Sequence, residues 1–146
     1  MNTSNGLTIT KGLPCSGKST WAEAQREAHP DRVRIVCRDD IRASLGTRFE
    51  DGDEDLVARV RDYAIDQLLI AGYRVICSDT NLSPKVERRL TQIAKTRKVP
   101  HEVLSFMHVS LETCLSRNAE RWASGNTKVP DSAIISMSNQ FLTESR

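Results

Sequence analysis

A short glycine-rich segment limits what this chain can fold into more than any other feature of its sequence. Residues 12–19 read GLPCSGKS, which matches the pattern GxxxxGK[ST] at every fixed position. The apolar run at residues 7–10 is typical of a β-strand, and residues 18–28 are typical of an α-helix. A full match between a strand and a helix predicts a phosphate-binding loop rather than a chance glycine-rich turn. The loop and the start of its helix comprise Gly12, Leu13, Pro14, Cys15, Ser16, Gly17, Lys18, Ser19 and Thr20.

This segment predicts the chemistry of ATP binding. Backbone NH groups in such a loop point inward around phosphate oxygens, and the amino end of the helix adds positive potential. Lys18 is expected to neutralise charge on the β- and γ-phosphates, and the hydroxyl of Ser19 is expected to ligate Mg²⁺. The predicted ligands are therefore ATP and Mg²⁺.

The rest of the chain alternates short β-like runs with longer helical ones, which is typical of a parallel sheet with crossover helices. We expect an α/β fold of about four parallel strands flanked by helices, in a single domain spanning residues 1–146. The further strands are expected at residues 32–37, 73–77 and 101–107. The further helices are expected at residues 39–45, 56–71, 84–97, 111–122 and 130–142, with an acidic solvated loop at 50–55 and a polar loop at 123–129.

Residues 37–42, CRDDIR, place two carboxylates and two guanidiniums at the end of the second predicted strand. Phosphoryl transfer to an alcohol needs a carboxylate that accepts the hydroxyl proton and cations that offset phosphoryl charge. Asp39 is the candidate base, and Arg42 lies one helical turn from Asp39 and Arg38. The alternative is purely structural: Asp39 or Asp40 caps the helix that begins here.

Two further clusters follow predicted elements. Asp79 and Thr80 lie in SDTN, at the end of the third strand, where a carboxylate can hold the metal or its water; an Asx turn is the alternative. Arg117 and Arg121 lie four residues apart, hence on one face of a helix. This face is typical of a lid that closes over phosphates, or of a solvated face that pairs with neighbouring glutamates.

Composition adds few constraints. The net charge of +2 is too small to indicate a nucleic-acid binder by itself. The four cysteines form no CxxC pair, which argues against a zinc knuckle or a disulfide framework. There is no signal-peptide pattern at the start and no apolar run of about 20 residues, so we interpret the protein as cytoplasmic, with no membrane partner.

The segments GLPCSGKSTW, CRDDIR, SDTNL, LSRNAER and TKVP occur in this order over about residues 6–140. The series resembles the kinase domain of the phage polynucleotide kinase/phosphatase family. The resemblance implies a P-loop kinase fold with an Arg-bearing lid helix, and transfer of the γ-phosphate of ATP to the 5′-hydroxyl end of DNA or RNA. It further implies that Asp39 is the general base, that Arg42 contacts the acceptor's phosphate, that Arg121 stabilises the transferring phosphoryl group and that Arg117 supports the donor. Lys18 and Ser19 would serve ATP and Mg²⁺, with Arg38 and Asp79 in supporting roles.

The sequence departs from the family pattern in two places. Residues 122–130, WASGNTKVP, form a longer link than is usual, which bears on the lid. No strand leads into a DxDGT motif, so the phosphatase half is missing; the acidic residues 51–55 mimic its letters and also make a poor calcium loop. The chain is then a kinase alone or one domain of a longer protein, with fused or separate end-repair domains as partners.

A nucleic-acid acceptor needs a basic approach to the cleft. The predicted acceptor-binding residues are Arg38, Asp39, Arg42, Arg48, Thr80 and Arg88. Aromatic residues make up only 5% of the chain, so base stacking is expected to be sparse, with Trp21 and Trp122 as candidates that more often belong to a core. The alternatives are a small-molecule kinase acting on a sugar, a nucleoside or a toxin-type substrate, and a non-catalytic ATP-binding module.

Overall fold

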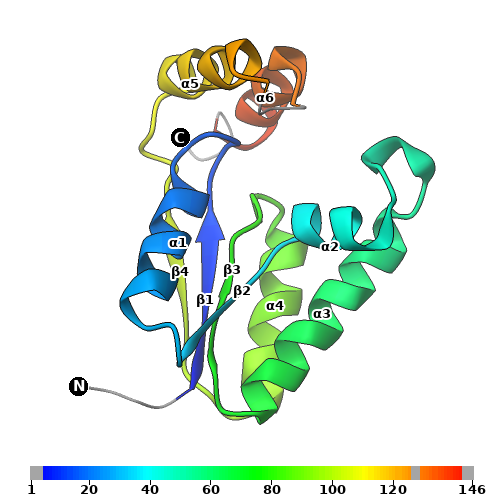
Figure 1. The fold of residues 1–146 in the computed structure, drawn as a ribbon, viewed down its shortest axis with the longest axis vertical. Helices are drawn as coiled ribbons and strands as arrows, with labels where there is room; N and C mark the ends of the chain where they lie inside the picture. Colours follow the sequence, from blue (N-terminus) through cyan, green and yellow to red (C-terminus); the bar gives the residue numbers. More distant parts are fainter. Residues whose placement is uncertain (1–4, 126–128, 143–146) are drawn as a thin grey trace.

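The computed structural model describes residues 5–125 and 129–142 and contains one parallel β-sheet (Figure 1). Its strands are β1 (Gly6–Lys11), β2 (Val33–Val36), β3 (Arg74–Cys77) and β4 (His101–Ser105), in the order β2-β3-β1-β4. All three strand pairs are parallel. The prediction of an α/β fold with about four parallel strands is confirmed. Because β3 lies between β1 and β2, the CRDDIR segment starts one strand away from the P-loop.

Helices flank the sheet on both faces. The α-helices are α1 (Lys18–Ala28), α2 (Arg38–Leu45), α3 (Glu54–Ile70), α4 (Pro84–Thr96), α5 (Leu111–Ala123) and α6 (Asp131–Met137). A 3-10 turn, η1 (Phe49–Asp51), lies between α2 and α3, and a π-helical turn, η2 (Ser138–Leu142), follows α6. In Figure 1, α3 and α4 cover one face, α1 covers the other, and α5 and α6 lie across the end where β1 runs into the P-loop. Within the described residues, no helix is long and apolar enough to span a membrane.

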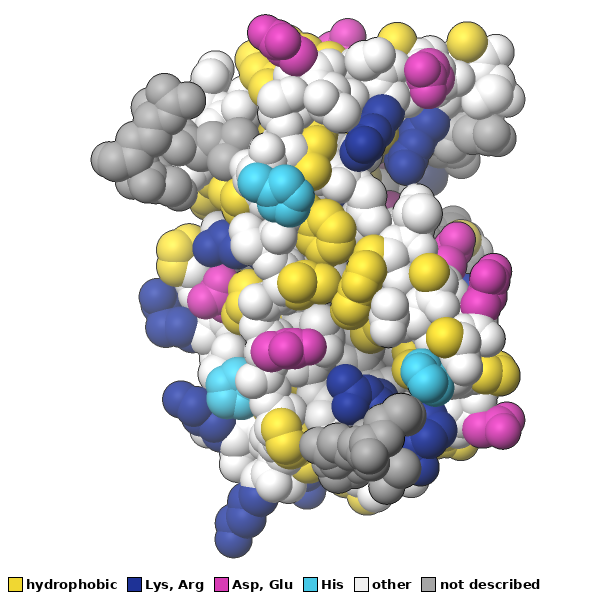
Figure 2. All heavy atoms as spheres, turned by 90° about the vertical axis from the view of Figure 1, so that its left-hand side faces the viewer, with side chains coloured by type: hydrophobic (Ala, Val, Ile, Leu, Met, Phe, Trp, Pro, Cys, Tyr) yellow, Lys and Arg dark blue, Asp and Glu magenta, His cyan; other side chains and the backbone are white. Residues whose placement is uncertain are grey.

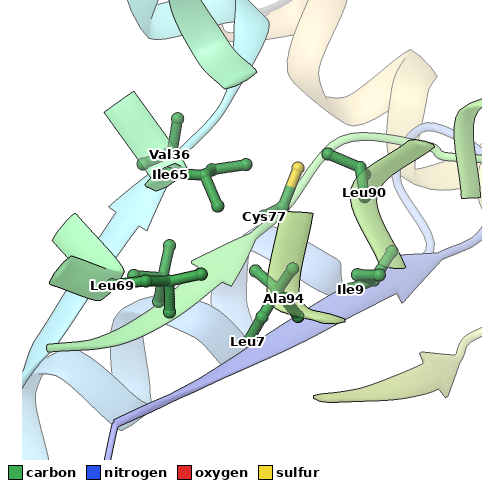
Figure 3. Packing of buried hydrophobic residues seen from close by; sticks show 9 residues of the cluster. Leu7, Ile9, Val36, Ile65, Leu69, Cys77, Leu90 and Ala94 are labelled. Carbon is green, nitrogen blue, oxygen red and sulfur yellow. The ribbon is translucent and has the colours of Figure 1, made fainter. Parts of the chain in front are cut away.

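The main core lies between the sheet and the pair α3 and α4, as Figure 3 shows. Each fully buried aliphatic side chain there stabilises the fold by about 1.5–3 kcal/mol relative to exposure. Its buried residues are Leu7, Ile9, Val36, Ile65, Leu69, Val75, Cys77, Leu90 and Ala94. A second cluster joins the P-loop to α5 and α6 through Leu13, Cys15, Leu82, Cys114 and Ile134. The core therefore fixes the carboxyl ends of the strands and the base of the predicted lid.

Two expectations about helix geometry were wrong. Helix α3 begins at Glu54 rather than at residue 56, and its buried row is Val57, Arg61, Ile65 and Leu69. Leu56, the first residue of the helix expected from the sequence, is exposed. The apolar spacing in the sequence does not reveal this row, because a charged residue, Arg61, occupies one of its positions.

Helix α2 corrects the capping alternative. Its N-cap is Cys37, with extended backbone and no side-chain capping bond, and Asp39 and Asp40 belong to the first turn. The helix starts directly at the strand end, so neither carboxylate is needed as a cap. The polar loop predicted at residues 123–129 includes residues 126–128, which lie outside the described residues.

Candidate active site

The P-loop links β1 to α1 and requires its glycines. A Cβ at Gly12 would meet the Ser16 hydroxyl at 2.7 Å and Cβ of Phe106 at 2.9 Å. Gly17 has φ 102°, in the left-handed region, and Cys15 adopts φ 66° without being glycine. Left-handed residues within a turn aim successive NH groups to one side, which is the geometry of an anion nest. The loop thus has the backbone shape that phosphate binding needs.

Neighbouring strand ends hold this loop in place. The Gly12 NH donates to the carbonyl of Thr80 over 3.0 Å. The buried Asn81 amide donates to the carbonyl of Thr10 over 2.9 Å. The SDTN segment therefore anchors the end of β1, and Thr80, predicted to bind the acceptor, contacts the P-loop through its backbone.

The buried side chain of Lys18 is folded onto the loop. Its Nζ donates to the carbonyls of Gly12 and Leu13 over 2.9 and 2.6 Å, and to the Ser16 hydroxyl over 3.2 Å. Burial lowers the pKa of Lys18 from 10.5 to about 8, and the positive charge of Arg121 contributes in the same direction. An anion that replaced these carbonyls as hydrogen-bond acceptor would therefore stabilise the protonated amine.

Helix α5 carries its two arginines over the P-loop. Nη1 of Arg117 donates to the carbonyl of Cys15 over 3.1 Å. Arg121, one turn further along, lies close enough to Lys18 to affect its pKa. Ser110 caps the helix through a bond from the Thr113 NH. In Figure 2, basic side chains lie on the underside of the upper part of the molecule, where Figure 1 places α5 and α6.

On the other side of the site, Arg42 joins a carboxylate to a second helix. Asp39 has 91% of its side chain exposed, and its Oδ1 accepts from Nη1 of Arg42 over 2.6 Å. Glu54, in the first turn of α3, holds the same guanidinium with both oxygens: Nε of Arg42 donates to Oε2 over 2.7 Å, and Nη2 donates to Oε1. The hydrogen bonds between them raise the pKa of Arg42 and lower that of Glu54. Asp39 is thus open to solvent, with a fixed cation beside it.

Arg42 and Asp39 form one end of a longer series of charges, in which four arginines alternate with four carboxylates. We call it the arginine–carboxylate chain; in order it comprises Asp39, Arg42, Glu54, Arg38, Asp79, Arg61, Asp62 and Arg89. Its middle is buried, with only 2% of the Arg61 side chain exposed. Such charges are tolerated inside a protein only when they are paired. The arginine–carboxylate chain connects the exposed Asp39 to the core.

Asp79 has several partners in this series. Its Oδ1 accepts from the backbone NH of Arg38 over 2.8 Å. Its Oδ2 accepts from Nη1 of Arg61 over 3.2 Å and lies 3.5 Å from Nε of Arg38. Ser19, predicted as the other metal ligand, is exposed in the first turn of α1, which suits direct ligation of Mg²⁺. Oδ2 also accepts from Sγ of Cys77 over 3.7 Å, whereas Oδ1 has a lone pair left. This residue therefore suits a bond from a metal-bound water better than direct ligation.

The remaining predicted acceptor residues lie at the surface. Arg48 is exposed and pairs with Glu50 and Asp51 of η1. Arg88 is exposed on α4. Reasoning from the sequence missed two residues that this geometry brings in, Glu54 and Arg61. A signal for Arg61 existed, because it lies four residues from Val57 and from Ile65 within the apolar row of α3.

Comparisons with known proteins bear on the family of the chain. A family model described as an AAA domain matches residues 7–143. The L-seryl-tRNA(Sec) kinase of Methanococcus maripaludis is 31% identical over 141 residues, covering 94% of this chain and 52% of the relative. A putative bifunctional polynucleotide kinase/RNA ligase of Autographa californica nuclear polyhedrosis virus is 30% identical over 136 residues, covering 81% of this chain and 18% of the relative. The chain thus spans about half or less of these relatives.

Solved structures show the same fold. A chain in the Pnkp1/Rnl/Hen1 RNA repair complex superposes with a TM-score of 0.78 at 24% identity, covering 98% of this chain and 46% of that one. Chaetomium thermophilum Kti12 in complex with ADP-AlF3 gives a TM-score of 0.71 at 21% identity, covering 92% of this chain and 79% of that one. At these identities, the likeness establishes the α/β P-loop fold.

Proposed function

This chain belongs to the AAA domain family matched over residues 7–143, and from that premise we propose that it transfers the γ-phosphate of ATP to the 5′-hydroxyl end of a nucleic acid. The observation that carries the proposal is Asp39, which is exposed at the start of α2 and bonded to Arg42. A phosphotransferase acting on an alcohol needs this pairing of base and cation at the same sheet edge as its P-loop.

On the acceptor side, the 5′-hydroxyl donates its proton to Asp39 as its oxygen attacks the γ-phosphorus, and the bond to the β-γ bridging oxygen breaks. Arg42 binds the acceptor's first phosphate, because Glu54 already orients its planar guanidinium. Arg38 extends this cationic surface, with Arg48 and Arg88 as outer contacts for the strand. Electrostatic contacts of this kind attract a polyanion without reading its sequence.

On the donor side, the loop NH groups and Lys18 bind the β- and γ-phosphates. The Lys18 amine exchanges its present bonds to loop carbonyls for bonds to phosphate oxygens. Arg117 and Arg121 of α5 offset charge on the transferring group. Mg²⁺, when bound, would neutralise charge between the β- and γ-phosphates, with Ser19 as its ligand and Asp79 on its water.

A second acceptor has a specific observation in its favour. The relative named as an L-seryl-tRNA(Sec) kinase matches 94% of this chain. The substrate in that relative's name also presents a primary alcohol on an RNA, so the same pair of Asp39 and Arg42 would serve it. The order of CRDDIR, SDTNL and LSRNAER favours the 5′-end, as does the viral relative whose name includes a polynucleotide kinase.

The test is transfer of label from γ-labelled ATP with Mg²⁺ to oligonucleotides that carry either a 5′-hydroxyl or a 5′-phosphate. We expect wild type to label only the former, and Asp39→Asn to lower the rate by about 10²- to 10⁴-fold. Asp40→Asn is the matched control, because Asp40 is the neighbouring exposed acid of the same turn, and its rate should stay within a few-fold. Wild type that labels no 5′-hydroxyl end of DNA or RNA would refute the proposal.

A further inference from the structure

An exposed aromatic ring stands beside the acceptor side of the site. Phe49, the first residue of η1 between α2 and α3 (Figure 1), is 68% exposed. The guanidinium carbon of Arg42 lies 5.5 Å from the centre of its ring. The same guanidinium donates to Asp39 over 2.6 Å. One side chain therefore links the ring to the proposed catalytic base.

Other aromatic side chains have different surroundings. Trp21 packs edge-on against Phe106, with ring centres 6.4 Å apart. Trp122 donates its indole NH to a backbone carbonyl next to α6. Tyr63 is as exposed as Phe49, but it lies nine residues beyond Glu54, about 13 Å along α3. Among the aromatic side chains that the structure describes, Phe49 is therefore the exposed one whose ring lies against Arg42 on the acceptor side.

The surroundings of Phe49 suit a flat ligand on its outer face. Arg42 stands against one face as a cation, and Glu54 and Asp39 hold that cation in place. Covering an apolar ring that is exposed to water lowers the free energy. Nucleobases stack on such rings with little dependence on sequence, since every base has a π-face. The 5′-terminal base is one ribose away from the hydroxyl that Asp39 would deprotonate.

We propose that the outer face of Phe49 is the stacking platform for the 5′-terminal base of the acceptor. The inference rests on the proposed function, because it assigns the ring to a nucleic-acid end. It favours acceptors whose first base is unpaired, since a base paired inside a duplex has both faces covered. It also predicts tolerance of any base at that position.

The experiment compares two single-stranded oligonucleotides with free 5′-hydroxyls, one with a normal first base and one abasic at that residue. With wild type, we expect kcat/KM to be about tenfold lower for the abasic acceptor, through KM. Phe49→Ala should lose about tenfold on the normal acceptor and almost nothing on the abasic one. Phe49→Trp should keep the discrimination, and Phe49→Leu, apolar without a π-face, should lose it.

Tyr63→Ala is the matched control, because it removes an equally exposed ring outside the site, and it should behave as wild type. If Phe49→Ala lowers kcat/KM equally on both acceptors, or leaves the normal acceptor unchanged, the stacking platform is refuted while the kinase assignment stands, because wild type still labels the ends. If wild type labels neither oligonucleotide, the proposed function fails and this inference fails with it.

Discussion

The proposed donor and acceptor sides of the site are held by different kinds of contact. On the donor side, charged groups bind backbone: Lys18 donates to the carbonyls of Gly12 and Leu13, and Arg117 donates to that of Cys15. The acceptor side is the arginine–carboxylate chain, in which side chains from α2, α3, α4 and the end of β3 bind one another. Backbone partners survive substitution, whereas each member of a charge series depends on its neighbours. The acceptor side should therefore be the more sensitive to single substitutions.

The largest expected effect is a loss of stability at the buried middle of the arginine–carboxylate chain. Arg61→Met leaves Asp79 and Asp62 without a partner they now share, so the free energy of unfolding should fall by about 3–5 kcal/mol. Denaturant unfolding followed by circular dichroism measures it. The matched control is Arg89→Met at the other end, where the arginine is 53% exposed and the loss should stay below about 1 kcal/mol. Equal losses would show that burial does not distinguish the two pairs.

A smaller effect, on activity, is expected at the end of the arginine–carboxylate chain that would contact the acceptor. Glu54→Gln removes the charge that orients Arg42, so kcat/KM for the oligonucleotide should fall by about 10- to 100-fold, or about 1.4–2.7 kcal/mol. The dissociation constant for ATP, measured by calorimetry, should not change. Glu50→Gln removes an exposed acid that pairs with Arg48 and is the control. Weaker ATP binding in Glu54→Gln would contradict the separation of the two sides.

The smallest effect concerns the donor side alone. Lys18 has a pKa of about 8 before ATP binds, so about half of the amine is deprotonated at pH 8. Phosphate charges raise that pKa, and binding should take up about half a proton at pH 8 and almost none at pH 6. Calorimetry in buffers of different ionisation enthalpy measures the uptake. Lys18→Arg stays protonated and should show none; an uptake that does not depend on Lys18 would contradict the assignment.

The same contrast explains what could be predicted from sequence. The P-loop and α1 are local: one motif sets the turn, the glycines and Lys18, and the structure has that helix at the predicted residues. Glu54 reaches Arg42 across 12 positions, and Arg61 reaches Asp79 across 18. No spacing rule connects such pairs, so an acidic segment looked like a solvated loop while its Glu54 binds Arg42.

The class of acceptor could not be predicted from the sequence for the same reason. Residues of CRDDIR indicate proton transfer and cation binding, but the class of alcohol depends on the surface around them. That surface includes Phe49, whose position beside Arg42 follows from the turn between α2 and α3 and from no motif. Strand order also lay beyond local patterns, because β3 inserts between β1 and β2.

The most direct test of the central claim is a competition in one reaction, with γ-labelled ATP, Mg²⁺ and equal amounts of a 5′-hydroxyl oligoribonucleotide and L-seryl-tRNA(Sec). The account predicts that label is recovered as a 5′-nucleotide after nuclease digestion of the oligonucleotide. Label recovered as phosphoserine after mild alkaline cleavage of the aminoacyl ester, with unlabelled oligonucleotide ends, would contradict it and assign the pair of Asp39 and Arg42 to the seryl hydroxyl.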